Sequence, residues 1–294
     1  MSDEPKSESA EPSAESASAG QRLLAWSVHA YTALGLVLAA VMAVLIVRGD
    51  AAAFRAAFAL MLVATLIDAT DGFLARAVRV KEVLPGFDGR QLDYLTDFLT
   101  YVVLPLLLVW RAAILPAAWE PWLIAPLLAG AYWFCQVQAK TDDGYFLGFP
   151  AYWNIVAFYL YVSDRQIAPL PGWLSLGVLL VFSVLTFVPT RYLYSTHRGR
   201  LNVVTNVLAG AWVVLVVWII VRLPNGEAST SRGDSWWPWV VVLSLLFPVY
   251  YLLVSWYLSW SLWRRGLASR DTVSCSASEL PPADGAGKGG GTER

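Results

Sequence analysis

Cysteine and histidine are both scarce in this sequence of 294 residues, which contains two of each. Cys135 falls in an apolar segment and Cys275 in a polar one, so neither a disulfide framework nor a cysteine metal site is indicated. His29 and His197 lack the spacing of a zinc site or of a nucleophile with its base. Charged residues make up only 15% of the chain and the formal net charge is −1, which argues against a nucleic-acid partner.

Apolar residues, by contrast, are abundant: 57% of the chain is hydrophobic, and fifteen residues are tryptophan. A helix that crosses a membrane needs about 20 mostly apolar residues. Eight segments meet or approach this requirement: Ala25–Val47, Ala52–Ala75, Leu92–Leu115, Pro121–Ala139, Phe149–Val162, Trp173–Tyr194, Val203–Val221 and Trp236–Trp263. The sequence therefore predicts an all-α, polytopic integral membrane protein with about eight transmembrane helices.

The two ends of the chain have a different composition. Residues 1–21 are rich in Ser, Ala and Glu, residues 269–294 are rich in turn-forming residues, and both have few large apolar side chains. Such segments cannot bury enough apolar surface to fold and are typical of disordered tails. We expect one membrane domain, residues 22–268, between two cytoplasmic tails.

Basic residues gather in alternate loops between the expected spans. Lys and Arg in short loops mark the cytoplasmic side of a membrane protein. They follow the second, sixth and eighth spans: Arg76, Arg79, Lys81 and Arg90; His197, Arg198 and Arg200; and Arg264, Arg265 and Arg270. With eight spans these three loops lie on one side. The sequence thus predicts that both termini and the end of the second span face the cytoplasm.

Four aspartates lie at the ends of two apolar spans. Asp68 and Asp71 are spaced i,i+3 and Asp93 and Asp97 are spaced i,i+4, so each pair occupies one face of a helix. Carboxylates in such places are costly and usually functional, although they could also reach the interface and pair with nearby arginines. A carboxylate site suits Mg²⁺ or Mn²⁺, which complete their shells with phosphate oxygens. We therefore expect a phosphoryl-transfer site with two metal ions and Asp97 as the candidate base.

Three further residues follow on the second span. Gly72 and Ala75 continue the face of Asp68 and Asp71, and their small side chains would leave room for a bulky ligand beside a metal ion. Gly72 could equally serve close packing between helices. Arg76 lies one helical turn beyond Gly72, where its guanidinium group can meet a phosphate.

This pattern resembles the signature of a known enzyme family. Asp68-x2-Asp71-Gly72-x2-Ala75-Arg76, followed by Gly89-x3-Asp93-x3-Asp97, is similar to the motif of the CDP-alcohol phosphatidyltransferases. Twelve residues separate Arg76 from Gly89, where most members have about eight, a difference that a loop can absorb. The longer spacer and the segment DDGYFLGFPAYWN resemble the bacterial members that use choline. The resemblance extends over most of the chain except the tails.

The resemblance implies a multi-pass protein of the bacterial inner membrane that transfers the phosphatidyl group of CDP-diacylglycerol to choline and releases CMP. It implies that Asp68, Asp71 and Asp93 hold two metal ions, and that Asp97 acts as base while it contacts the second ion. By the same resemblance Gly72 and Arg76 would contact the CDP-lipid. The family also suggests a homodimer.

Aromatic side chains are candidates for the choline site, because a quaternary ammonium is best recognised by aromatic faces. Tyr145, Phe146, Tyr152 and Trp153 surround the loop after Lys140, and Tyr132 and Trp133 precede it. They could instead form an interfacial aromatic belt. In the same region, Asp142 and Asp143 could add negative charge or simply be solvated.

Four polar residues keep two interpretations each. Lys140, Arg191 and Arg198 could gather the phosphates of the lipid, but the positive-inside tendency would also explain them. Asn154 could reach into the site or make a hydrogen bond between helices.

Two other functions have to be weighed. Acids in membrane spans also serve cation or choline transporters, but a transporter would have acids distributed along a pathway rather than clustered beside Gly72 and Arg76. A related transferase could use serine as its acceptor. The serine carboxylate would require a dedicated Arg or Lys near the acceptor pocket, whereas choline tolerates aromatic walls.

Overall fold

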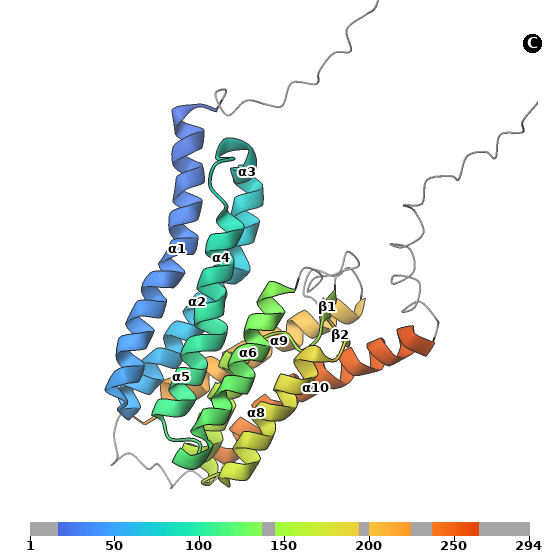
Figure 1. Ribbon diagram of the computed structural model, residues 1–294. Coiled ribbons are helices and arrows are strands. Elements are labelled where there is room, and N and C mark those ends of the chain that lie inside the picture. Colours follow the sequence, from blue (N-terminus) through green and yellow to red (C-terminus); the bar gives the residue numbers. More distant parts are fainter. Residues whose placement is uncertain (1–16, 137–144, 194–199, 225–236, 265–294) are drawn as a thin grey trace, which may run out of the picture.

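The computed structural model describes residues 17–136, 145–193, 200–224 and 237–264. The fold is helical, and long helices dominate it (Figure 1). The N-terminal half contains α1 (Ala19–Arg48), α2 (Ala51–Val78), the single turn α3 (Val80–Val83), α4 (Gly89–Asp97), the π-helix η2 (Phe98–Val103), α5 (Leu104–Arg111), the 3₁₀-helix η3 (Ala117–Leu123) and α6 (Ile124–Cys135). The remainder contains β1 (Tyr145–Leu147), α7 (Trp153–Val162), the π-helix η4 (Ser163–Ile167), α8 (Gly172–Phe187), β2 (Arg191–Leu193), α9 (Arg200–Arg222) and α10 (Trp237–Arg264).

Each of the eight apolar segments contains a helix, and within the described residues five of these helices are long and apolar enough to cross a membrane. They are Ala19–Arg48, Ala51–Val78, the continuous stretch Gly89–Arg111 made of α4, η2 and α5, Asn202–Arg222 and Trp237–Ser261. The helices α6, α7 and α8 have 12, 10 and 16 residues. At about 1.5 Å per residue each is shorter than the hydrocarbon core of about 30 Å. The chain is a multi-pass membrane protein, and the count of eight spans stays a prediction.

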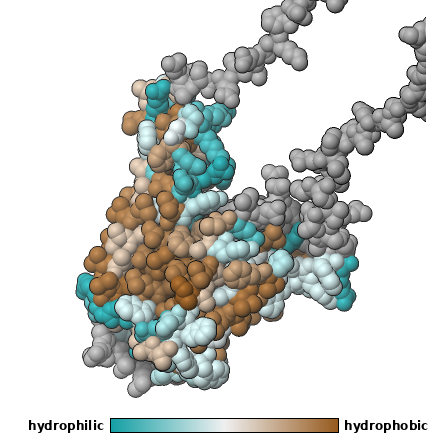
Figure 2. All heavy atoms as spheres, in the orientation of Figure 1, coloured by the Kyte–Doolittle hydropathy of each residue, from teal (hydrophilic) through white to brown (hydrophobic). Residues whose placement is uncertain are grey.

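The surface of the protein agrees with a lipid environment. Large apolar side chains lie exposed along the long helices, among them Val37 and Val44 of α1, Leu66 of α2 and Val214 of α9. In Figure 2 apolar residues cover the middle of the visible face, and hydrophilic residues gather at the projecting end of α1 to α4 and at the opposite end. Such an outer surface is stable where lipid rather than water surrounds it.

The interior packs α1 and α2 against the rest of the bundle. The core continues through α5 and α7. Between α2 and α7, the rings of Phe54 and Phe58 meet those of Phe158 and Tyr161. In Figure 1 the ends of α1, α2 and α4 that lie next to α3 project beyond the other helices. The feature that the sequence did not predict is a short antiparallel ribbon in which β1 pairs with β2, with Tyr145 opposite Leu193 and Leu147 opposite Arg191.

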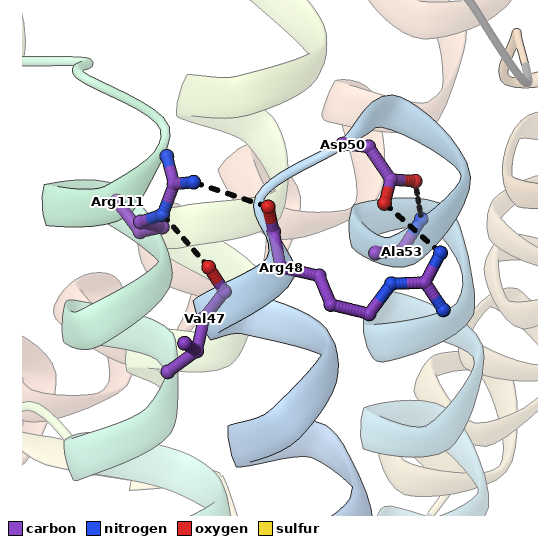
Figure 3. A network of polar contacts seen from close by, with 5 residues as sticks. All are labelled: Val47, Arg48, Asp50, Ala53 and Arg111. Carbon is purple, nitrogen blue, oxygen red and sulfur yellow. Dashed lines mark hydrogen bonds and ion pairs between the residues drawn. The ribbon is translucent and has the colours of Figure 1, made fainter.

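The tight turn between α1 and α2 depends on three local devices (Figure 3). Gly49 ends α1 with φ 72°, a conformation that favours glycine, and Asp50 caps α2 by accepting a hydrogen bond from the Ala53 N–H. That hydrogen bond, with the nearby Arg48 side chain, lowers the pKa of Asp50, so the cap is charged at neutral pH. Arg111 of α5 donates from Nε to the Val47 carbonyl and from Nη2 to the Arg48 carbonyl, at 3.1 Å each. Arg111 thereby satisfies the last carbonyls of α1.

Replacing Arg111 by alanine should therefore destabilise the protein. The change removes two hydrogen bonds from a charged donor, and since Arg111 is exposed we expect a loss of about 1 kcal/mol in the free energy of unfolding. The matched control is Arg48→Ala, which breaks only the exposed pair with Asp50 (3.1 Å) and should cost less. Thermal unfolding in detergent would compare the two variants. Equal midpoints would contradict the capping role of Arg111.

Candidate metal centre

The four aspartates predicted from the sequence line one small cleft. Asp68 and Asp71 come from α2, and Asp93 and Asp97 come from α4. The cleft is completed by Thr32, Gly35, Ala64, Ile67 and Thr96. One oxygen of each of Asp68, Asp71 and Asp93 lies within 4.8 Å of the other two. The structure thus brings together two pairs that are more than twenty residues apart in the chain.

Close packing of α1 on the other two helices builds this cleft. A Cβ atom on Gly35 of α1 would lie 2.4 Å from Cγ2 of Thr96, a separation that no real Cβ contact has. Glycine at this position therefore permits α1 to approach α4. Between α2 and α4, Arg79 ends α2 with φ 54° and turns the chain into α3. Asp88 then caps α4, its Oδ1 accepting from the N–H groups of Arg90 and Gln91 at 3.0 and 3.3 Å.

Two hydroxyl groups from outside α2 donate to its aspartates. Thr32 of α1 donates to Asp71 Oδ2 at 2.9 Å, and Tyr101 of η2 donates to Asp68 Oδ2 at 2.7 Å. Asp71 is 6% exposed, whereas Asp68, Asp93 and Asp97 are half-buried. Sequence reasoning did not identify either hydroxyl. A signal existed for Tyr101, which follows Asp97 by four residues and so shares its side of the helix.

The donor set suits a divalent cation. Three carboxylates within 4.8 Å of one another repel, and a bound cation would remove that repulsion. Carboxylate oxygens are the ligands that Mg²⁺ and Mn²⁺ prefer. Asp97 lines the same cleft and is close enough along α4 to extend the site. The cluster of three aspartates could therefore hold a metal ion.

Gly72, Ala75 and Arg76 follow Asp71 on α2, and none of them is among the residues that line the cleft. Gly72 is half-buried, and a Cβ atom there would meet only Nη1 of Arg76, at 3.4 Å. The exposed Arg76 side chain thus lies beside Gly72, as the spacing predicted. Ala75 packs on a small apolar cluster formed by Ala25, Val28 and Val80.

The predicted acceptor residues are placed in different surroundings. The Tyr152 ring lies 6.4 Å from the ring of Tyr101, which in turn reaches Asp68. Trp153 is instead fully buried in the core, with its ring 5.9 Å from that of Phe149, and it does not line the cleft. Asn154 donates to Thr65 Oγ1 at 3.5 Å, which is a hydrogen bond between α7 and α2.

Two of the remaining predicted residues belong to the ribbon. Tyr145 belongs to β1 and Arg191 to β2, and the Arg191 N–H donates to Ser259 of α10 at 2.9 Å. Neither is among the residues that line the cleft. Lys140, Asp142, Asp143, His197 and Arg198 lie outside the described residues. The roles assigned to all these side chains stay predictions.

The sequence of the chain is similar to those of several bacterial proteins. No family model matches the chain. The chain is 36% identical to phosphatidylcholine synthase of Pseudomonas aeruginosa over 201 residues, which is 68% of this chain and 81% of that protein. It is 35% identical to phosphatidylcholine synthase of Legionella pneumophila over 240 residues, or 81% of this chain and 89% of that protein. The corresponding protein of Bradyrhizobium diazoefficiens is 38% identical over 200 residues, 68% of this chain and 72% of the relative.

These similarities cover most of both sequences and agree with the motif and with the helical membrane fold. The expectation of a CDP-alcohol phosphatidyltransferase of the choline-using kind is thereby confirmed at the level of the family. The chain belongs to the phosphatidylcholine synthase family.

Proposed function

We propose that this protein transfers the phosphatidyl group of CDP-diacylglycerol to choline and thereby forms phosphatidylcholine and CMP. The new bond joins the choline oxygen to the phosphorus of the phosphatidyl group. The bond that breaks joins this phosphorus to the oxygen that leaves with CMP, and the choline hydroxyl gives up its proton. The observation that carries the proposal is the gathering of Asp68, Asp71 and Asp93 within 4.8 Å, beside Asp97, in a member of this family.

The four aspartates have distinct proposed tasks. Asp68, Asp71 and Asp93 would hold two divalent ions, Mn²⁺ or Mg²⁺, with Asp97 contacting the second. Bound there, such ions supply charge neutralisation for the pyrophosphate and for the departing phosphate. Asp97 would accept the proton of the choline hydroxyl, because it lines the acidic cleft and is half-buried. Its exposure leaves room for an acceptor to approach.

The residues around the cleft would bind and orient the two substrates. Arg76 lies over the open space at Gly72, where its guanidinium group could hold the CDP-lipid. The small side chain of Ala75 and the charges of Lys140 and Arg191 are proposed to assist in binding that lipid. Tyr152, whose ring lies against Tyr101, is our candidate for the wall that recognises the choline ammonium, with Tyr145 as a further candidate. Trp153 is the third aromatic candidate from the sequence, but its side chain is buried in the core.

The proposed location is the bacterial inner membrane, with the cleft open to the cytoplasm. Arg76, Arg79, Lys81 and Arg90 lie at the end of the bundle where α2, α3 and α4 meet, which is the end that carries the cleft. Basic residues at one end mark the cytoplasmic side, where CDP-linked substrates are made. The homodimer suggested by the family stays a prediction.

The first test is the release of CMP by the purified protein in detergent, with CDP-diacylglycerol and Mn²⁺. Choline, serine and no acceptor should be compared, and the lipid product identified by mass. We expect CMP release that depends on choline, the formation of phosphatidylcholine, and loss of both when EDTA removes the metal. Consumption of serine instead of choline would show that serine is the acceptor. If no CMP were released with any metal, the proposed transferase activity would be contradicted and transport would be favoured.

The role of Asp97 can be tested by Asp97→Asn. The amide keeps the shape of the side chain but cannot accept the proton, so kcat should fall by about 10²- to 10⁴-fold. CDP-diacylglycerol binding, measured by calorimetry, should stay near that of the parent. Asp68→Asn or Asp71→Asn should also raise the Mn²⁺ concentration needed for half-maximal rate, and by more than Asp97→Asn, since Asp97 would contact only the second ion.

The matched control for these variants is Asp50→Asn. It makes the same chemical change outside the cleft, and asparagine caps a helix as well as aspartate does. Its activity should therefore equal that of the parent. If Asp97→Asn also had parental activity, Asp97 could not be the base.

The proposed acceptor wall predicts a difference between two substitutions of Tyr152. Tyr152→Phe keeps the aromatic face and should leave the KM for choline nearly unchanged. Tyr152→Leu removes it and should raise that KM by about tenfold, the effect of losing a cation–π contact of about 1.4 kcal/mol. The control is Tyr257→Leu, since Tyr257 of α10 is exposed and is not among the residues that line the cleft. An equal KM for Tyr152→Leu and the parent would exclude Tyr152 from the choline site.

A further inference from the structure

Among the described residues, two buried hydroxyl groups donate to aspartates of the cleft, and they come from different elements. Thr32 is 7% exposed and Tyr101 is 8% exposed. Each donates to the Oδ2 atom of one aspartate of α2, Thr32 to Asp71 and Tyr101 to Asp68. The two acceptors are separated from their donors by 39 and 33 residues in the chain. The contacts are therefore products of the tertiary fold and not of one local turn.

A hydrogen bond to one oxygen constrains the whole carboxylate. The terminal torsion of an aspartate side chain has a broad energy well, so the plane of the carboxylate is poorly fixed by the backbone alone. A donor held in the packed interior fixes this plane and, with it, the direction of the other oxygen. Groups that donate in this way to metal ligands usually alter metal affinity by about 10- to 100-fold. Thr32 and Tyr101 each donate such a hydrogen bond to one aspartate of the cluster.

Tyr101 lies in a π-helix. The π-helix η2 begins at Phe98, directly after Asp97, and its wider turn changes the direction of the side chains that follow. Single π turns of this kind occur often at functional sites. Here the turn contains Tyr101, whose hydroxyl reaches across to α2 while its ring meets Tyr152.

We infer that Thr32 and Tyr101 are positioning residues that orient Asp71 and Asp68 for a divalent cation. This inference rests on the proposed function, since it concerns the same site. The two hydroxyl groups, one from α1 and one from η2, would then affect the affinity of the site for a metal ion, although neither is a proposed ligand of that ion.

The test uses the full-length protein in detergent and the variants Tyr101→Phe and Thr32→Val. Both changes remove a hydroxyl and keep the approximate shape of the side chain. The dissociation constant for Mn²⁺, measured by calorimetry without substrate, should rise about tenfold or more in each variant. The Mn²⁺ concentration for half-maximal rate should rise in parallel, and saturating Mn²⁺ should restore most of kcat. The KM for choline should stay unchanged in Tyr101→Phe, because the ring beside Tyr152 remains.

The matched control is Tyr159→Phe. The Tyr159 hydroxyl is also buried and hydrogen-bonded, but its partners are Ser244 at 3.0 Å and the Trp212 indole at 2.8 Å rather than an aspartate. This variant should lower the thermal midpoint without changing the Mn²⁺ dissociation constant. Parental Mn²⁺ affinity in both test variants would overturn the positioning role alone. Absence of Mn²⁺ binding by the wild-type protein would overturn the proposed function and the positioning role together.

Discussion

The repulsion among carboxylates at one end of the helical bundle is the constraint on which the rest of this structure depends. At 4.8 Å and an effective dielectric constant of about 20, two like charges repel by about 3 kcal/mol. Three such groups stay together only if packing forces them to, or if a cation and hydrogen bonds offset the repulsion. The fold supplies packing through Gly35 and hydrogen bonds through Thr32 and Tyr101. A divalent cation would supply the remaining compensation.

Two regions of the protein are held together by different kinds of contact. The acidic cleft lies among the helices α1, α2 and α4. Caps and a left-handed turn at Arg79 fix the ends of these helices, and close backbone approach at Gly35 fixes their spacing. The elements α7, β2 and α10 are joined by aromatic packing: Phe149 meets both Trp153 and Tyr192, and the stacked rings of Tyr192 and Tyr251 lie 6.2 Å apart. The contact of Tyr101 with Tyr152 joins these two regions.

Much of this arrangement follows from short-range patterns in the sequence. The spacing of Asp68 with Asp71, and of Asp93 with Asp97, fixes each pair on one helix face, and apolar segments of adequate length mark the long helices. The sequence could not show that Tyr101 and Thr32 reach these aspartates, because their partners are 33 and 39 residues away. It also could not separate Trp153, which is buried in the core, from its neighbour Tyr152, since composition alone makes both candidates for an aromatic wall. Tertiary packing decides such cases.

The spacer between the two halves of the motif shows why loop length matters little to the site. Its twelve residues leave α2 through Arg79, form α3 and enter α4 at the cap Asp88. The loop is also fixed against α1, since the His29 ring lies 4.4 Å from that of Phe87, and a Cβ atom on Gly89 would lie 2.5 Å from Cε1 of His29. The register of α4 is thus set by contacts at the two ends of the spacer and not by the number of residues between them. A longer spacer can therefore be accommodated while Asp93 still faces Asp68 and Asp71.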